Sequence, residues 1–230
     1  DLHKAIRRQR QMCIRDSTTT VMACPCKKMI SPAMNHNMYH NPIVQDNIRK
    51  LERFGYEMIA PDRGMLANGD DGDGRMPEPE VLFEYILREL AFEKDLAGKN
   101  VLVTAGATME AIDPVRYITN HSSGKMGCAV AKAAMQRGAK VTLVAGHMEI
   151  LPPMFVDVVN VKSAADMFEA VTKLAPEQDI IVKAAAVADY TPVAVADNKI
   201  KKSDDDMKIE LKRTKDILCL LYTSPSPRDS

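Results

Sequence analysis

Small and polar residues end an apolar run at 101–108 (VLVTAGAT), where Gly106 and Thr108 follow a predicted strand. In an open parallel sheet, ligands bind beyond the carboxyl ends of the strands, and small residues there let backbone N–H groups approach a phosphate. A tight turn that only packs a helix against a strand would have the same composition. This segment alone therefore leaves a phosphate site and a structural turn equally open.

A second candidate is the segment 120–127 (NHSSGKMG), at the start of a predicted helix. Ser123, Gly124 and Lys125 would supply a hydroxyl, N–H donors and a cation, which together suit an anion. The spacing is not that of a Walker A loop, because Thr119 and Met126 stand where that motif has Gly and Ser or Thr. Lys125 alone would be an ordinary solvated lysine, so the prediction depends on the whole cluster.

Two further charged segments follow in the second half. The segment 183–190 (KAAAVADY) ends a predicted strand, and Asp189 at its tip suits a ribose or, through water, Mg²⁺. A turn aspartate is an equally ordinary explanation. The segment 198–202 (NKIKK) is either a solvated hairpin edge or a mobile lid that carries a cation to phosphates.

The residues that nicotinamide chemistry requires are missing. No Tyr is followed four residues later by Lys, as the short-chain dehydrogenases require. The strand predicted at 141–145 is followed by Gly146 and His147, not by the acidic residue that would hold an adenosine ribose. The sequence therefore argues against hydride transfer.

The first half contains a loop and a Gly/Asp-rich segment. Asn35 ends the loop 31–35 (SPAMN), and its amide is suited to orienting a carboxylate. The segment 64–76 (GMLANGDDGDGRM) lacks the Glu that closes an EF-hand loop, so we expect a flexible clamp in which Arg75 binds a carboxylate or phosphate. The pair Cys24 and Cys26 is more simply explained by two small buried thiols than by a metal or redox site.

The elements that must position these residues follow from periodicity. Strand, helix and strand alternate in the second half, which is typical of a Rossmann-like parallel sheet with right-handed crossovers. The charged segment 94–100 (KDLAGKN) separates two periodicities and is predicted to be a linker. The predicted helices are 41–55, 79–92, 122–137 and 163–174, and the predicted strands are 56–60, 101–105, 139–145 and 179–187.

The composition of the chain limits the class of protein, its partners and its compartment. The chain has 230 residues, 31 Lys plus Arg, 31 Asp plus Glu and 46% hydrophobic residues, which indicates a folded protein. Zero formal charge argues against a nucleic-acid or anionic-membrane partner, and no apolar run is long enough for a membrane span. Five scattered cysteines and a start without a signal-peptide pattern favour the cytoplasm. We expect the segments 1–17 and 219–230 to be tails outside the folded domains.

Five motifs, in order, make the chain resemble a known family. They are 31–39 (SPAMNHNMY), 69–76 (GDDGDGRM), 105–108 with 112–126 (IDPVRYITNHSSGKM), 184–190 and 198–202. The chain is similar over residues 18–218 to the bifunctional coenzyme A biosynthesis proteins. In this family a phosphopantothenoylcysteine decarboxylase is fused to a phosphopantothenate-cysteine ligase.

For the first half, residues 18–93, the resemblance implies the C-terminal part of a flavodoxin-like, FMN-dependent decarboxylase domain. Met34 and Asn35 would bind the substrate carboxylate, and Arg75 would belong to a clamp over it. Asn68 stands where well-known members have a Cys that acts as proton donor, and an amide donates a proton less readily. The flavin-binding start of the family domain and its catalytic His have no counterpart here.

For the second half, residues 101–218, the resemblance implies the N-terminal part of the ligase. It implies that CTP and Mg²⁺ convert the carboxylate of 4'-phosphopantothenate to an acyl-cytidylate, which the amine of cysteine then attacks. Asn120, Arg116 and Lys199 would serve this chemistry, with the metal ligands unknown. The nucleotide-binding residues would be Gly106, Thr108, Ser123, Gly124, Lys125, Lys183, Ala184, Ala185, Asp189, Lys199, Asp216, Ile217 and Leu218.

The resemblance also bears on activity and assembly. The family acts on 4'-phosphopantothenate, cysteine and 4'-phosphopantothenoylcysteine, and it forms dimers through the ligase and trimers through the decarboxylase. Because family segments are missing at both ends, we expect impaired activity of the chain as given. The alternative is a non-catalytic nucleotide-binding or flavoprotein-type regulatory module.

Overall fold

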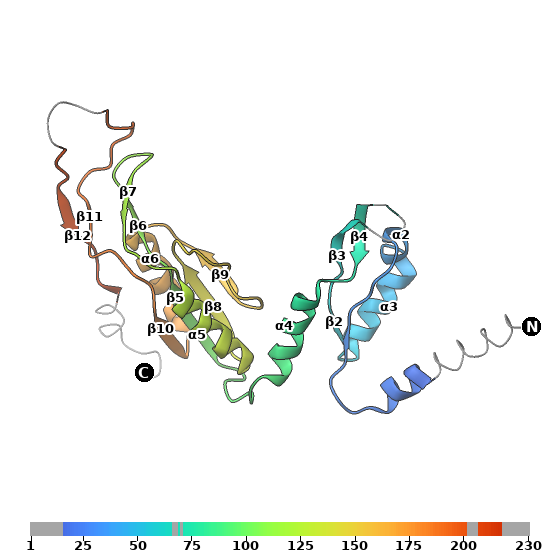
Figure 1. The fold of residues 1–230 in the computed structure, drawn as a ribbon. Helices are drawn as coiled ribbons and strands as arrows, with labels where there is room; N and C mark the ends of the chain where they lie inside the picture. Colours follow the sequence, from blue (N-terminus) through green and yellow to red (C-terminus); the bar gives the residue numbers. More distant parts are fainter. Residues whose placement is uncertain (1–15, 66–68, 70, 202–206, 218–230) are drawn as a thin grey trace, which may run out of the picture. The chain divides into compact units, whose positions relative to one another are not determined.

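The computed structural model describes residues 16–65, 69, 71–201 and 207–217, which form two compact units (Figure 1). The first unit comprises residues 1–82 and the second comprises residues 83–230. Helix α4 (Pro79–Leu90) contains the boundary between them. The described residues include no helix that is long and apolar enough to cross a membrane.

The first unit is built from short elements. Residues 16–23 are helical, and β1 (Met29–Ile30) pairs in parallel with β2 (Glu57–Met58). Helix α2 (His36–Tyr39) is followed by α3 (Pro42–Arg53). The prediction of a helix beginning at Asn41 is confirmed, since the Asn41 side chain accepts a hydrogen bond from the Ile43 N–H and Pro42 occupies the first turn.

The Gly/Asp-rich segment, for which a flexible clamp was predicted, contains an antiparallel strand pair. Strand β3 (Asp62–Met65) pairs antiparallel with β4 (Asp71–Arg75). The N–H of Met34 donates to the carbonyl of Gly74 at 2.9 Å, so the loop before α2 lies against β4. Gly74 has φ +131°, and any side chain there would collide with the Met34 carbonyl, which explains the glycine.

The second unit contains the predicted parallel sheet. Its strand order is β10-β5-β8-β9, and all three pairings are parallel. This arrangement confirms the predicted α/β fold with strands joined by helical crossovers. The strands are β5 (Asn100–Ala105), β8 (Lys140–Ala145), β9 (Asp157–Asn160) and β10 (Ile180–Lys183); the helices are α5 (Lys125–Gln136), α6 (Ala164–Leu174) and the 3₁₀ turn η1 (Ala175–Glu177).

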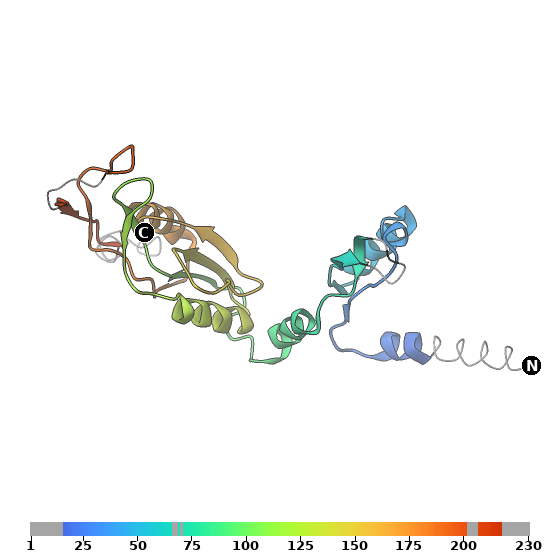
Figure 2. The same ribbon diagram turned by 45° about the horizontal axis from the view of Figure 1, so that its top comes forward.

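Alternate residues of β5 face the two sides of this sheet. Val101 and Val103 pack against α5, in a cluster with Ala131. Leu102 packs on the other side with Met167 of α6, and both side chains are fully buried. Figure 2 shows the two helices on opposite faces of the sheet. The continuous apolar run of β5 therefore reflects burial on both faces.

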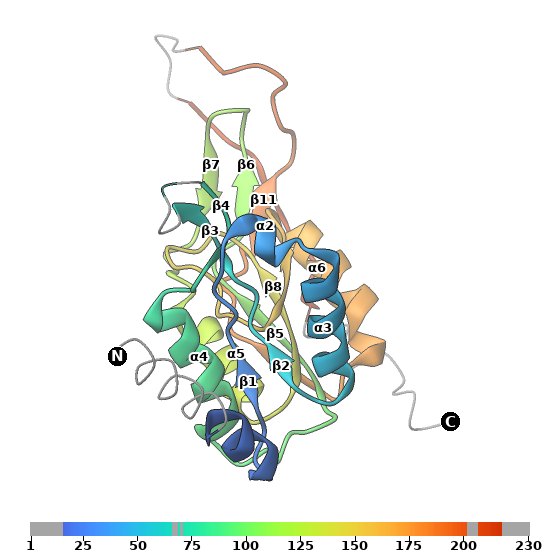
Figure 3. The same ribbon diagram turned by 90° about the vertical axis from the view of Figure 1, so that its right-hand side faces the viewer.

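Two antiparallel strand pairs and the edge strand β9 of the parallel sheet were not predicted. One hairpin pairs β6 (Met109–Ala111) with β7 (Tyr117–Thr119), and the other pairs β11 (Tyr190–Pro192) with β12 (Leu211–Arg213). Both extend from the end of the sheet (Figure 3). The strand predicted over 179–187 is shorter than expected, because regular pairing ends at Lys183 and only Ala186 forms a further bridge.

The segment 94–100, predicted as a linker, has no helix or strand before Asn100 but packs on the second unit. Leu96 contacts the α5-side core, and its N–H donates to the carbonyl of Arg137 at 3.0 Å. The ammonium of Lys94 donates to the carbonyl of Gln136 at 2.6 Å. The predicted domain bounds stay a prediction.

Candidate functional site

The turns that follow β5, β8 and β10 converge at the carboxyl edge of the sheet. The N–H of Ala107 donates to the carbonyl of His147 at 2.9 Å, and the N–H of Ala186 donates to the carbonyl of Gly106 at 2.8 Å. Gly106 has φ +79°, and a side chain would collide with the His147 carbonyl. Gly106 therefore permits close packing of these turns, and the predicted contact with a nucleotide would have to use its backbone.

Two threonine hydroxyls hold the segment after β10. Thr104 Oγ1 accepts from the N–H groups of Ala184 and Ala185, each at 3.2 Å. Thr108 Oγ1 accepts from the N–H of Ala188 at 2.9 Å, and Thr108 is fully buried. The structure thus gives Thr108 a positioning role, because its hydroxyl is engaged with the backbone. Thr104 was not predicted, since a threonine inside an apolar strand gives no signal of function.

Asn120 reaches the same segment from the turn before α5. Its side-chain amide donates to the carbonyls of Ala186 and Val187, at 3.4 and 3.2 Å. Helix α5 begins after Gly124, which has φ +77° and no side-chain cap. The first N–H groups of α5 therefore have no capping side chain, and the exposed Lys125 opens the helix. Ser123 is half-buried beside them, and its carbonyl accepts from the N–H of Glu149.

A pocket of about 440 Å³ lies between the end of β10 and the chain that follows β12. Lys183 and Asp189 line it from one side, and Asp216 and Ile217 line it from the other. Lys183 Nζ lies 3.9 Å from Asp216 Oδ1. The two segments are tied together because the Thr214 hydroxyl donates to the carbonyl of Ala188 at 2.7 Å. Four of the predicted nucleotide-binding residues thus lie around one pocket.

Two cations of this pocket were missed from the sequence. Arg213 and Lys215 also line it and flank Thr214. The three basic residues within 212–215 (KRTK) are a possible signal, but a charge run is more often a solvated edge. With Lys183 they give three cations against two carboxylates, a balance that suits a polyphosphate bound with a divalent cation.

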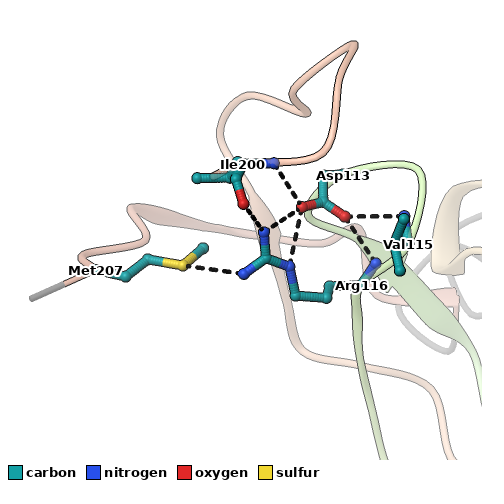
Figure 4. Close-up of polar contacts among 5 residues, drawn as sticks. All are labelled: Asp113, Val115, Arg116, Ile200 and Met207. Atoms are coloured by element: carbon teal, nitrogen blue, oxygen red, sulfur yellow. Dashed lines mark hydrogen bonds and ion pairs between the residues drawn. The ribbon is translucent and has the colours of Figure 1, made fainter. Parts of the chain in front are cut away.

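Arg116 is held by a buried carboxylate (Figure 4). Its Nε and Nη2 donate to Asp113 Oδ2 at 2.9 and 2.7 Å, and Nη2 also donates to the carbonyl of Ile200 at 2.7 Å. Burial raises the pKa of Asp113, but hydrogen bonds from Val115, Arg116 and Ile200 outweigh burial and hold that pKa well below its ordinary range. Arg116 is therefore fixed in place, and it lines a second cavity of about 1220 Å³.

Lys199 lies beside this ion pair but in neither cavity. It is exposed, and its neighbour Ile200 donates its N–H to Asp113 Oδ2 at 3.2 Å. The ion pair thus fixes the backbone next to Lys199 and leaves the lysine side chain at the surface. Leu218, the last predicted nucleotide contact, lies outside the described residues.

In the first unit, Met34 and Asn35 lie against β4. Asn35 Oδ1 accepts from the N–H of Asn37 at 2.9 Å and caps α2, which leaves its amide N–H groups to donate. Arg75 pairs with Glu78 and is half-exposed. Asn68 lies outside the described residues.

The pair of cysteines corrects an expectation. Cys26 is exposed and Cys24 is only half-buried, so they are not the buried thiols that were expected. Their Sγ atoms lie 3.0 Å apart, and the hydrogen bond between them lowers the pKa of Cys24 and raises that of Cys26.

Two family models match the chain. The model of the DNA/pantothenate metabolism flavoprotein C-terminal domain matches residues 96–228. The chain belongs to this family. A second family model, described as Flavoprotein, matches residues 12–91.

The chain spans about half the length of the curated relatives it matches. It is 50% identical over 204 residues to the coenzyme A biosynthesis bifunctional protein CoaBC of Vibrio vulnificus strain YJ016, covering 87% of this chain and 50% of that protein. It is 48% identical over 204 residues to CoaBC of Bacillus subtilis strain 168, with the same coverage. A crystal structure of a CoaBC C-terminal domain shares 49% identity and covers 55% of this chain and 59% of that one, at a TM-score of 0.48.

Proposed function

We propose that the second unit binds CTP and takes part in joining 4'-phosphopantothenate to cysteine. What supports this most is the pocket of Lys183, Asp189 and Asp216 at the carboxyl edge of the sheet. Parallel sheets bind nucleotides at this edge, and the three cations of the pocket match a triphosphate. Family membership and the CoaBC relatives favour the same activity.

The chemistry that such a site would perform is activation of a carboxylate. The carboxylate of 4'-phosphopantothenate attacks the α-phosphorus of CTP, and pyrophosphate leaves. The amine of cysteine then attacks the acyl carbon, and CMP leaves as the amide forms and a proton is lost. A carboxylate is a poor electrophile, so it has to be activated before the amine of cysteine can attack it. Cationic groups assist the attack on CTP because they neutralise the phosphates.

The described residues divide these tasks between them. Lys183, with Arg213 and Lys215, would hold the phosphates, while Asp189 and Asp216 have the oxygen ligands that suit Mg²⁺. A bound Mg²⁺ would supply further neutralisation of the triphosphate. Asn120 would orient an oxygen of the acyl-cytidylate, since its amide already lies at the carbonyls of the nucleotide-binding segment. Lys199 would approach the phosphates from its surface loop.

For the first unit we propose a part in decarboxylation of 4'-phosphopantothenoylcysteine. The free amide N–H groups of Asn35 suit a substrate carboxylate, and β4 lies beside them. The Flavoprotein family model matches residues 12–91, but the N-termini of α2 and α3 are capped by Asn35 and Asn41 and offer no open site for the FMN phosphate. No step through FMN is therefore assigned to them.

The setting of this activity is also a proposal. We infer a homo-oligomer in the cytoplasm, as the relatedness to CoaBC implies. The free thiols of Cys24, Cys26 and Cys128 are in keeping with a reducing compartment.

The pocket can be tested by titrating CTP with Mg²⁺ into the full chain. Lys183→Met should weaken CTP binding by about tenfold or more, because a charge-assisted contact is lost. Lys140→Met is the matched control, since Lys140 begins β8 at the opposite edge of the sheet and should leave binding unchanged. Equal effects of the two variants would remove the pocket from the proposal.

A further inference from the structure

Two histidines and an aspartate meet in the first unit, outside the residues that the proposed function uses. His36 begins α2, His40 follows its last residue, and Asp73 lies on β4. Their ligand atoms all lie within 4.8 Å of one another. We propose that His36, His40 and Asp73 bind a divalent transition-metal ion, with Zn²⁺ as the ion that best suits two imidazoles and a carboxylate.

The hydrogen bonds show which lone pairs are available. His36 Nδ1 accepts from the N–H of Asp73 at 3.2 Å, so this nitrogen carries no proton, as a metal ligand requires. His40 Nε2 lies 2.9 Å from Asp73 Oδ2, and an ionised carboxylate only accepts, so the ring donates there. A metal ion would replace that one proton, which passes to solvent, and would exchange two weak polar contacts for three coordinate bonds.

The three ligands need little movement to surround an ion. Zn²⁺ bonds of about 2.0–2.2 Å place ligand atoms about 3.3 Å apart in a tetrahedron. The distances from Asp73 Oδ2 to the two ring nitrogens, 2.9 and 4.0 Å, bracket that value. The two imidazole rings already lie close together, with centroids 4.4 Å apart and planes tilted by 59°.

The backbone around the cluster is closely packed. A side chain at Gly72 would place its Cβ 2.9 Å from His36 Nδ1, so the ring rests directly on the β4 backbone. The hydrogen bond from the N–H of Met34 to the carbonyl of Gly74 also holds the loop before α2 against β4. The ligands are thus held in register by contacts that do not involve the metal.

The site is open to solvent and has room for a water ligand. The side chains of His36, His40 and Asp73 are 43%, 49% and 40% exposed. Three protein ligands leave a fourth zinc position for water. A bound ion would tie α2 to the β3–β4 hairpin, whether or not the decarboxylase proposal holds.

The test uses the full chain with the four cysteines other than the buried Cys128 replaced by serine, because Cys24 and Cys26 are a competing thiol pair. After chelator treatment, Zn²⁺ alone is titrated by calorimetry, and Co²⁺ is added to record its absorption bands. We expect one site per chain, and His40→Ala should weaken it by at least about tenfold. Asp73→Asn should weaken it as well while keeping the side-chain shape.

His147→Ala is the control, since His147 is an exposed histidine of the second unit. It should leave zinc affinity and the cobalt spectrum unchanged. Circular dichroism of each variant separates loss of binding from loss of folding. The proposal is overturned if the parent chain binds no Zn²⁺, or if His40→Ala and His147→Ala bind it equally well.

Discussion

The carboxylate of Asp113 accepts hydrogen bonds from the backbone of Val115, Arg116 and Ile200 and from the guanidinium of Arg116. Its side chain is fully buried, while that of Arg116 is 39% exposed. One buried charge thus fixes both a predicted catalytic cation and the loop that carries Lys199. We therefore regard Asp113 as a positioning residue for the proposed ligase chemistry, one that the sequence did not single out.

Replacing Asp113 by Asn keeps its shape but removes the charge and turns an acceptor into a donor. We expect Asp113→Asn to lower the urea midpoint of the second unit at pH 7, because Arg116 loses its buried partner. The matched control is Asp157→Asn, at the exposed start of β9, which should change the midpoint little.

The lowered pKa of Asp113 predicts that its contribution to stability depends on pH. The pKa of Asp113 in the folded chain lies below the value of about 3.9 in an unfolded chain. Its contribution to stability is therefore fully present above that value and is lost as the pH falls toward the folded-state pKa. The difference in midpoint between wild type and Asp113→Asn should shrink below about pH 4. A difference that grows on acidification would contradict the assignment.

Among the secondary-structure elements, helix α5 packs closely against the carboxyl end of strand β5. Gly127 lies in the first turn of α5, directly over the end of β5. A Cβ there would lie 2.5 Å from Ala105 Cβ and 2.9 Å from the Thr104 carbonyl. The absence of a side chain at Gly127 therefore lets the uncapped start of α5 lie close to the sheet.

Gly127→Ala should destabilise the second unit by about 1–3 kcal/mol through overpacking. Alanine is the better helix former by about 1 kcal/mol, so any net loss has to come from the collision. Urea unfolding measures this change, and Ala129→Ser, exposed on the same helix, should stay within about 0.5 kcal/mol of wild type. A Gly127→Ala variant as stable as wild type would show that α5 can move away from β5 at no cost.

In the second unit, the longer elements with apolar runs were predictable from the sequence, and the short strands of the two hairpins were not. Strand β5 and helix α5 have the apolar runs that two-sided or one-sided burial demands. Strand β12 is exposed at every residue, and the β6–β7 hairpin exists through pairing across a turn, so neither has a clear periodicity. For the site, motif resemblance indicated Lys183 and Asp216, whereas Arg213 and Lys215 depend on tertiary pairing of β11 with β12.

At the scale of the whole molecule, the two units differ in how much apolar surface they bury. Among the described residues of the first unit, Ile59 and Pro77 are the buried apolar side chains. The second unit buries two clusters, one on each face of its sheet. Hydrophobic burial dominates folding stability, so the second unit should be the more stable of the two.

Hydrogen exchange with mass spectrometry can follow each unit in the full chain. Leu102→Ala should accelerate exchange in the second unit by removing about 2–5 kcal/mol of core stability. Ile59→Ala should act in the same way on β1 and β2 of the first unit. If either variant accelerated exchange equally throughout the described chain, the two units would not be separate cooperative elements.

Binding of CTP in the pocket beside β10 can be decided by a calorimetric comparison of nucleotides. CTP and ATP are titrated separately, each with Mg²⁺, into the full chain. We predict saturable binding of CTP with a lower Kd than that of ATP, and weaker binding of both nucleotides in Lys183→Met, because Lys183 would contact the phosphates that they share. Binding of ATP as tight as that of CTP, or no binding of either nucleotide, would contradict the account.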